Sequence, residues 1–183
     1  AFFRKEALAV VGLAWVVAAM IGAIPFQWSG AIPDGQSAIF ETVSGLTTTG
    51  ATVFGSADYA CVEDLPRSLL LWRAMTQWIG GLGIILVFVT LLPAMGVTGK
   101  SLLQSEQIGL SSEGFQPRML DQARMLLVVY LVLTTACGVL LWLVGIPAFD
   151  ALCHAMTALA TGGFSTRNTS VAAFASPAAE MVL

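Results

Sequence analysis

The chain has 183 residues, of which 57% are hydrophobic and only 10% are charged. Its mean hydropathy of +0.84 exceeds what a soluble domain of this size normally carries. The net charge is −3, and the 8 basic residues are spread along the chain, so the clustered positive charge of a nucleic-acid-binding protein is missing. Composition therefore excludes an ordinary soluble domain and a nucleic-acid partner, and it predicts that membrane lipid surrounds the chain.

Three uncharged stretches, residues 7–26, 74–97 and 125–149, are long enough to cross a bilayer. Crossing takes roughly 20 apolar residues at the rise of an α-helix. Because the lipid core offers no hydrogen-bond partners to the main chain, each stretch is expected to be helical. The sequence therefore predicts an all-α, multi-pass membrane protein.

Basic residues near the ends of these stretches predict the orientation in the membrane. Arg4 and Lys5 precede the first stretch, and Lys100, Arg118 and Arg124 lie between the second and the third. Because cytoplasmic loops carry an excess of Lys and Arg, we expect these segments and the N-terminus to be cytoplasmic.

Two further segments, residues 38–52 and 149–168, are too short and polar to cross the membrane and too apolar for ordinary loops. Each has Phe followed by a carboxylate at or near its start, Phe40-Glu41 and Phe149-Asp150, and continues as a short apolar helix to a Thr-Gly pair. We interpret them as re-entrant pore loops of an internal repeat, with residues 49–51 aligned on residues 161–163 and a small gap. The repeating unit is a helix, a short pore helix, an extended polar loop and a helix.

Such loops can remove water from a cation, because main-chain carbonyl oxygens replace the hydration shell when several loops meet on one axis. Glycine in the loop can adopt backbone angles that let successive carbonyls point the same way. A single Thr-Gly run also fits a turn or a close helix contact, and that alternative stays open for either loop alone. Repetition after two spans favours a potassium selectivity filter, with the candidate residues Thr47, Thr48, Thr49, Gly50, Ala160, Thr161, Gly162 and Gly163.

Other polar and small residues receive structural interpretations. Arg73 is expected to extend outward or to bond to neighbouring main chain rather than to contact the ion. Glu41 and Asp150 are placed at the N-terminal ends of the two pore helices, where a carboxylate suits the helix dipole. His154 is expected to be hydrogen-bonded within its pore helix, and no nucleophile, base or metal-ligand set accompanies it, so no enzyme is predicted. The glycines at 80, 81 and 83 indicate close helix packing rather than a nucleotide loop.

The same residues resemble a known family. Residues 41–52, Glu-Thr-Val-Ser-Gly-Leu-Thr-Thr-Thr-Gly-Ala-Thr, are similar to the first pore loop of the TrkH/KtrB potassium transporters of the Trk/Ktr/HKT superfamily. Residues 160–166, Ala-Thr-Gly-Gly-Phe-Ser-Thr, resemble the second pore loop. Trp72-Arg73 and residues 77–83, Gln-Trp-Ile-Gly-Gly-Leu-Gly, resemble the helix that follows the first loop. The resemblance is specific to TrkH-like members and covers nearly the whole chain.

That resemblance implies a potassium-channel-like fold of four helix, pore-loop, helix units around one pore. The chain is then expected to be an N-terminal-half fragment with one complete unit at 1–99, a cytoplasmic linker at 100–124 and a truncated second unit at 125–183. The resemblance also implies that glycine at position 50 goes with potassium selectivity, whereas serine there is associated with sodium-permeable relatives.

The function implied by the resemblance is potassium uptake across the bacterial inner membrane, with K+ as the bound ion. The implied partners are a second copy in a homodimer and a cytosolic nucleotide-binding regulatory subunit of the TrkA type. Two alternatives stay open, an ion-coupled secondary transporter and a sodium/potassium cation channel of related architecture.

Overall fold

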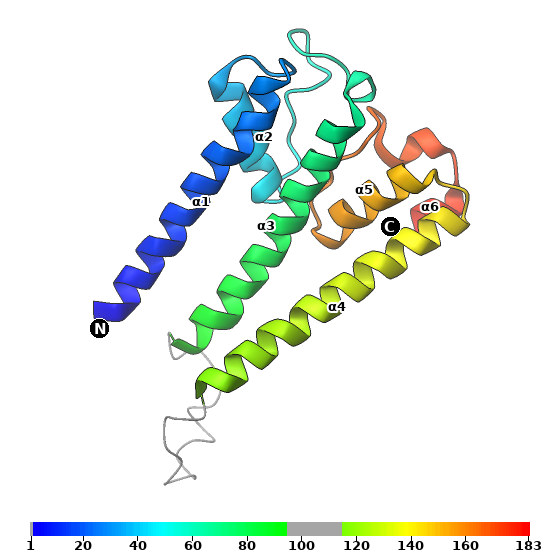
Figure 1. Ribbon diagram of the computed structural model, residues 1–183. Helices are drawn as coiled ribbons and strands as arrows, with labels where there is room; N and C mark the ends of the chain where they lie inside the picture. Colours follow the sequence, from blue (N-terminus) through cyan, green and yellow to red (C-terminus); the bar gives the residue numbers. More distant parts are fainter. Residues whose placement is uncertain (1, 95–114) are drawn as a thin grey trace.

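The computed structural model describes residues 2–94 and 115–183 (Figure 1). Part of the predicted linker, residues 100–114, lies outside the described residues. Within the described residues all regular secondary structure is helical and no strand is present, which confirms the predicted fold class. The elements in chain order are α1 Phe2–Trp28, α2 Gly35–Leu46, η1 Val62–Asp64, α3 Arg67–Ala94, α4 Phe115–Leu143, α5 Ala148–Leu159, η5 Ser170–Phe174 and α6 Pro177–Val182.

Three helices are long and apolar enough to cross a membrane, in segments Leu8–Trp28, Arg67–Val87 and Ala123–Leu143. They belong to α1, α3 and α4, and Figure 1 shows them as the long rods of the molecule. The second segment starts upstream of the predicted position 74. The prediction placed the charged residues Arg67 and Arg73 outside the spanning helix, whereas α3 includes both of them. The third segment ends at Leu143 rather than at the predicted position 149, because residues 148 and 149 already belong to α5. The three spanning helices were therefore predicted correctly, but the start of the second and the end of the third were misplaced.

The outward faces of α1 and α4 are apolar. Val10 and Leu13 on α1 are each 65% exposed, and Val132 on α4 is 59% exposed. Large exposed apolar surfaces are unfavourable in water and are typical of helices that face lipid.

The two short helices lie near the same end of the long ones (Figure 1). Each has 12 residues, and a turn and loop formed by residues 47–50 or 160–163 follow it. Asp34 caps α2 by accepting a hydrogen bond from the Ser37 N–H at 2.8 Å, and this bond lowers the pKa of the Asp34 carboxyl. Pro147 precedes α5 at the equivalent position.

Helix α3 contacts α1, α4 and both short helices. The Trp72 indole N–H donates to the carbonyl of Gly22 on α1 at 3.0 Å. On the other side, the Trp78 indole N–H donates to the Thr134 hydroxyl at 3.1 Å, and the Tyr130 hydroxyl donates to the carbonyl of Trp78 at 3.2 Å. The closing helix of the first unit is therefore bonded to the helices on both sides.

Glycines on α3 allow the short helices to approach closely. A side chain at Gly80 would overlap the main-chain oxygen of Leu46, the last residue of α2. A Cβ atom at Gly81 would lie 3.0 Å from the Cα atom of Ala160, directly after α5. These contacts confirm that the glycine-rich stretch serves helix packing.

Replacing Gly80 with alanine is therefore expected to destabilise the fold by about 1–3 kcal/mol, because α2 must move away from α3. Gly12→Ala on α1 is the matched control, since a Cβ atom there meets nothing within 4 Å. Thermal unfolding in detergent measures the difference. Equal stability of the two variants would contradict the close contact between α2 and α3.

Candidate functional site: the loops that follow the two short helices

The two loops that follow α2 and α5 share an unusual backbone. Matching the two helices end to end pairs Thr48 with Thr161 and Gly50 with Gly163. The φ angles are 55° and 53° at the threonines, and 79° and 83° at the glycines. The predicted alignment of residues 49–51 on 161–163 is therefore wrong by one residue, because the Thr-Gly pairs that look alike in sequence are not structurally equivalent.

The threonines carry the strain in this backbone. A β-branched residue with positive φ is a rare outlier, because its side chain crowds the following carbonyl. Such strain is of order 1–3 kcal/mol and persists only where the surrounding structure imposes it. Thr48 and Thr161 adopt the same strained conformation at equivalent positions of the two loops, which marks these positions as candidates for function.

The main-chain amides of both loops point back to their helices. The Thr49 N–H donates to the Ser44 carbonyl at 2.9 Å, and the Gly162 N–H donates to the Thr157 carbonyl at 2.9 Å. In a trans peptide unit the N–H and the preceding carbonyl point in opposite directions. Because the N–H groups of residues 48–50 point back to α2, the carbonyls of residues 47–49 are on the side away from it.

Within the described part of the chain, no hydrogen bond reaches the main-chain oxygens of residues 47–50, 160, 161 or 163. Thr47, Thr49, Thr161 and Gly163 are exposed. Main-chain carbonyls at membrane depth need a polar partner, so this row of oxygens is suited to a cation or to water. The threonine hydroxyls brace the first loop, since Thr47 Oγ1 lies 2.8 Å from both Thr49 Oγ1 and the Val43 carbonyl.

The two loops touch each other at their glycines. A Cβ atom at Gly50 would overlap the main-chain oxygen of Gly162. Positive φ and lack of space therefore both require glycine at position 50.

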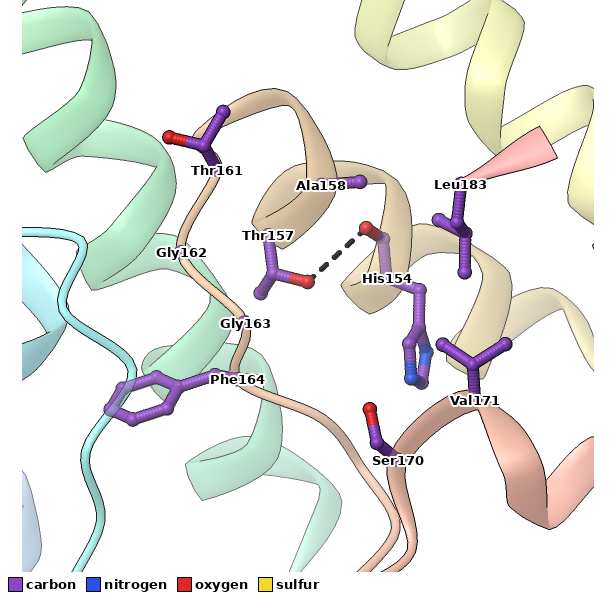
Figure 2. Close-up of a pocket in the computed structure, with 10 residues that line it drawn as sticks. All are labelled: His154, Thr157, Ala158, Thr161, Gly162, Gly163, Phe164, Ser170, Val171 and Leu183. Atoms are coloured by element: carbon purple, nitrogen blue, oxygen red, sulfur yellow. Dashed lines mark hydrogen bonds between the residues drawn. The ribbon is translucent and has the colours of Figure 1, made fainter. Parts of the chain in front are cut away.

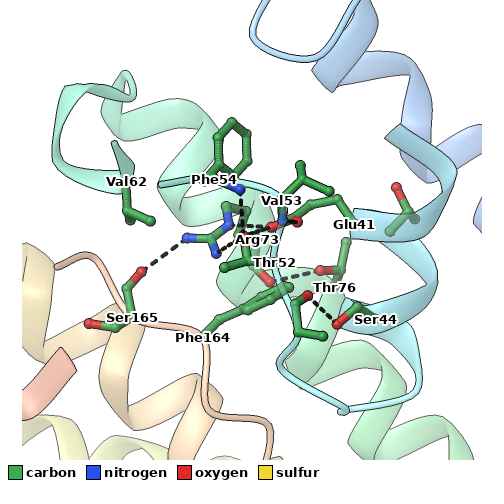
Figure 3. A network of polar contacts seen from close by, with 12 residues as sticks. Glu41, Ser44, Thr52, Val53, Phe54, Val62, Arg73, Thr76, Phe164 and Ser165 are labelled. Atoms are coloured by element: carbon green, nitrogen blue, oxygen red, sulfur yellow. Dashed lines mark hydrogen bonds and ion pairs between the residues drawn. The ribbon is translucent and has the colours of Figure 1, made fainter. Parts of the chain in front are cut away.

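A buried ion pair lies behind the first loop (Figure 3). Arg73 Nε donates to Glu41 Oε1 at 2.9 Å, and the two side chains are 2% and 0% exposed. The same carboxylate accepts bonds from the Thr52 hydroxyl at 2.9 Å and from the Val53 N–H at 3.0 Å. Glu41, which belongs to α2, thus connects residues 52 and 53 after the first loop with Arg73 on α3.

Arg73 also reaches the second loop. Its Nη1 donates to the Ser165 carbonyl at 3.0 Å, and its guanidinium carbon lies 4.3 Å from the centre of the Phe164 ring. The expectation that this side chain extends outward is wrong, because a carboxylate inside the protein neutralises it. The bond to the Ser165 carbonyl agrees with the other expectation, a main-chain partner, and this partner lies 92 positions away in the sequence. Glu41 lies in the middle of α2, so its predicted place at the start of the pore helix is wrong as well.

Asp150 lies in the first turn of α5, as predicted. Its carboxylate accepts the Thr166 hydroxyl at 2.7 Å and Arg167 Nη2 at 3.3 Å. These bonds hold the main chain that leaves the second loop.

His154 occupies in α5 the position that Glu41 occupies in α2. Its ring nitrogens lie 2.8 Å from the Asp150 carbonyl and 3.0 Å from the Ser165 hydroxyl, which confirms that this histidine has partners within its pore unit. The described residues contain no group of three or more His, Cys, Asp or Glu side chains that could hold a metal ion.

An open cavity of about 380 Å³ lies beside the second loop, lined by residues that include His154, Thr157 and Gly163. Figure 2 shows the Phe164 side chain on the opposite side of the loop from His154. The second loop therefore has one face towards this cavity and one face towards α3 and the first loop.

Sequence reasoning missed Gln77 as a site residue. This α3 side chain is fully buried; its Nε2 donates to the Gly162 carbonyl at 2.8 Å, and its Oε1 accepts the Phe164 N–H at 3.1 Å. A polar amide within a helix predicted to span the membrane was the signal that could have identified it.

Spanning helices combined with two re-entrant pore helices and extended loops define a membrane protein of the pore-loop class. The model of the TrkH family, described as a cation transport protein, matches residues 4–183. The chain belongs to this family of transport proteins.

Individual relatives agree with this assignment. The chain is 41% identical to the Trk system potassium uptake protein TrkH of Salmonella typhimurium and 40% identical to that of Escherichia coli K12, in each case over 98% of the chain and 36% of the relative. The crystal structure of the potassium transporter TrkH from Vibrio parahaemolyticus superposes with a TM-score of 0.78 at 38% identity, over 98% of this chain and 34% of that one. The chain thus spans 36% of the length of these curated relatives.

Proposed function

We propose that this chain contributes two of the loops of a potassium selectivity filter and that the complete protein takes up potassium. The observation that carries the proposal is the matched strain at Thr48 and Thr161, each followed two residues later by a glycine of positive φ. A threonine in this conformation is uncommon, and its recurrence at equivalent positions of the two loops supports a shared role for them. Support also comes from relatives whose names state potassium uptake.

The filter residues are those expected from the sequence, namely Thr47, Thr48, Thr49, Gly50, Ala160, Thr161, Gly162 and Gly163. Their carbonyl oxygens replace water around a potassium ion, together with oxygens from further loops on the same axis. The C-terminal ends of α2 and α5 contribute the negative ends of their helix dipoles. The Gly162 oxygen already accepts one bond from Gln77, and a carbonyl has a second lone pair for the ion.

The cellular setting belongs to the same proposal. The protein lies in a bacterial inner membrane with its N-terminus in the cytoplasm, as the basic residues indicate. It works as a homodimer and is regulated by a TrkA-type cytosolic subunit, as the family resemblance suggests. The designation "Trk system" of the relatives supports a system of several components.

Rubidium uptake by proteoliposomes that contain the complete protein tests this function. Unlabelled potassium is expected to compete with radioactive rubidium, whereas sodium at the same concentration is expected to compete weakly, because the larger ions fit the carbonyl spacing. Equal competition by sodium would contradict a potassium-selective filter. Uptake that requires a proton or sodium gradient would instead favour the ion-coupled transporter.

A further inference from the structure

The helix α3 holds the second loop although it belongs to the first unit. Gln77 binds the loop through both ends of its amide, to the carbonyl of Gly162 and to the N–H of Phe164. The amide nitrogen Nε2 can only donate a hydrogen bond, and the amide oxygen Oε1 can only accept one. The bond to the Gly162 carbonyl and the bond from the Phe164 N–H therefore require the same orientation of the Gln77 amide. The two bonds therefore place the peptide units between these residues in one position.

Arg73 extends this attachment by one helical turn. Its bond to the Ser165 carbonyl and its stacking on the Phe164 ring continue the contact along the loop. Two buried side chains of α3 therefore bind residues 162–165 on the side of the loop that faces α3.

The Gly162 peptide lies between Gln77 and the first loop. A Cβ atom at Gly162 would overlap the Gln77 side chain, and a Cβ atom at Gly50 would overlap the Gly162 oxygen. A rotation of the Gly162 peptide would therefore change the distance between the two loops as well as the direction of one carbonyl.

We propose that Gln77 is a positioning residue for ion selectivity, which holds the Gly162 carbonyl and thereby sets the spacing between the two loops. This inference rests on the proposed filter function and adds a residue of α3 to those that determine ion selectivity. Selectivity depends on the spacing and number of the oxygens around the ion. When the bond from Gln77 is absent, the Gly162 carbonyl can turn, and the loops can close around the smaller sodium ion.

Two substitutions of Gln77 in the complete protein separate its two bonds. Gln77→Met removes both bonds with little change in volume, and Gln77→Glu keeps an acceptor for the Phe164 N–H but removes the donor to Gly162. Competition of potassium and sodium against rubidium uptake in proteoliposomes measures the selectivity. Both variants are expected to lower the ratio of potassium to sodium competition by roughly threefold to tenfold, the change expected from losing the hydrogen bond to the Gly162 carbonyl, which both variants lack.

The ratio does not depend on the amount of folded protein, so a loss of stability alone leaves it unchanged. Gln36→Met, at an exposed position at the start of α2, is the matched control and is expected to keep the original ratio. An unchanged ratio in both Gln77 variants would overturn the inference. If Gly50→Ser changes the ratio in the same assay while the Gln77 variants do not, the inference fails and the filter stands. If none of these variants changes it, the proposed filter fails too.

Discussion

Replacing Gly50 with serine in the complete protein is expected to reduce its preference for potassium over sodium by about tenfold. The positive φ of 79° at this position costs a residue with a side chain about 1–2 kcal/mol, and the loop can relieve this strain only by moving its carbonyls. A loss of about 1.4 kcal/mol in the preference for potassium corresponds to a factor of ten. The new Cβ atom would also overlap the Gly162 oxygen, so the two loops must separate. Both effects disturb the spacing of the carbonyl oxygens.

Gly30→Ser is the matched control for this prediction. Gly30 has a similar φ of 73°, and a Cβ atom there meets nothing within 4 Å. The control substitution therefore introduces comparable backbone strain away from both loops. Rubidium uptake with competing sodium measures both variants, and an equal loss of selectivity in the two would show that strain anywhere in the fold, and not the filter position, is responsible.

Removing Arg73 is expected to produce the largest loss of stability. Arg73→Met leaves the Glu41 carboxylate buried without its counter-charge, and breaking a buried ion pair from one side typically costs about 3–5 kcal/mol. It also removes the bonds to the Thr52 hydroxyl and the Ser165 carbonyl. Both loops lose a common support, so unfolding and loss of rubidium uptake are expected together.

The double variant Glu41→Met with Arg73→Met is expected to recover part of the stability, because no buried charge remains unpaired. Arg124→Met is the control, since Arg124 and Asp121 form an exposed pair at 4.0 Å whose loss is expected to cost less than about 1 kcal/mol. Unfolding of the purified proteins in detergent gives the differences. Similar small effects of Arg73→Met and Arg124→Met would contradict the buried position of the Arg73 and Glu41 pair.

Much of the architecture could be predicted from the sequence, since hydropathy and the positions of Pro and Gly carry that information. Lipid forces apolar stretches of this length into helices, so the three spans followed from composition. The start of α3 was not predicted, because charged residues were expected to lie outside a spanning helix. Arg67 and Arg73 lie within it, and Arg73 is neutralised by a carboxylate 32 positions earlier in the chain.

Fewer features of the candidate site than of the fold could be predicted from the sequence. The Thr-Gly segments were recognised, but their register was shifted by one residue, because the equivalence of Gly50 and Gly163 depends on backbone angles that the letters do not encode. The supporting residues were missed for a related reason. Arg73 and the Ser165 carbonyl are 92 positions apart, and only the packing of α3 against both loops brings them together.

The central claim is that main-chain oxygens of residues 47–50 and 160–163 coordinate a potassium ion stripped of water. A structure of the complete protein with thallium or rubidium in place of potassium tests it most directly, because anomalous scattering locates these ions. We expect an ion on the axis shared by the loops, in contact with carbonyl oxygens of both segments. An ion held only by side chains, or placed away from both loops, would contradict the claim.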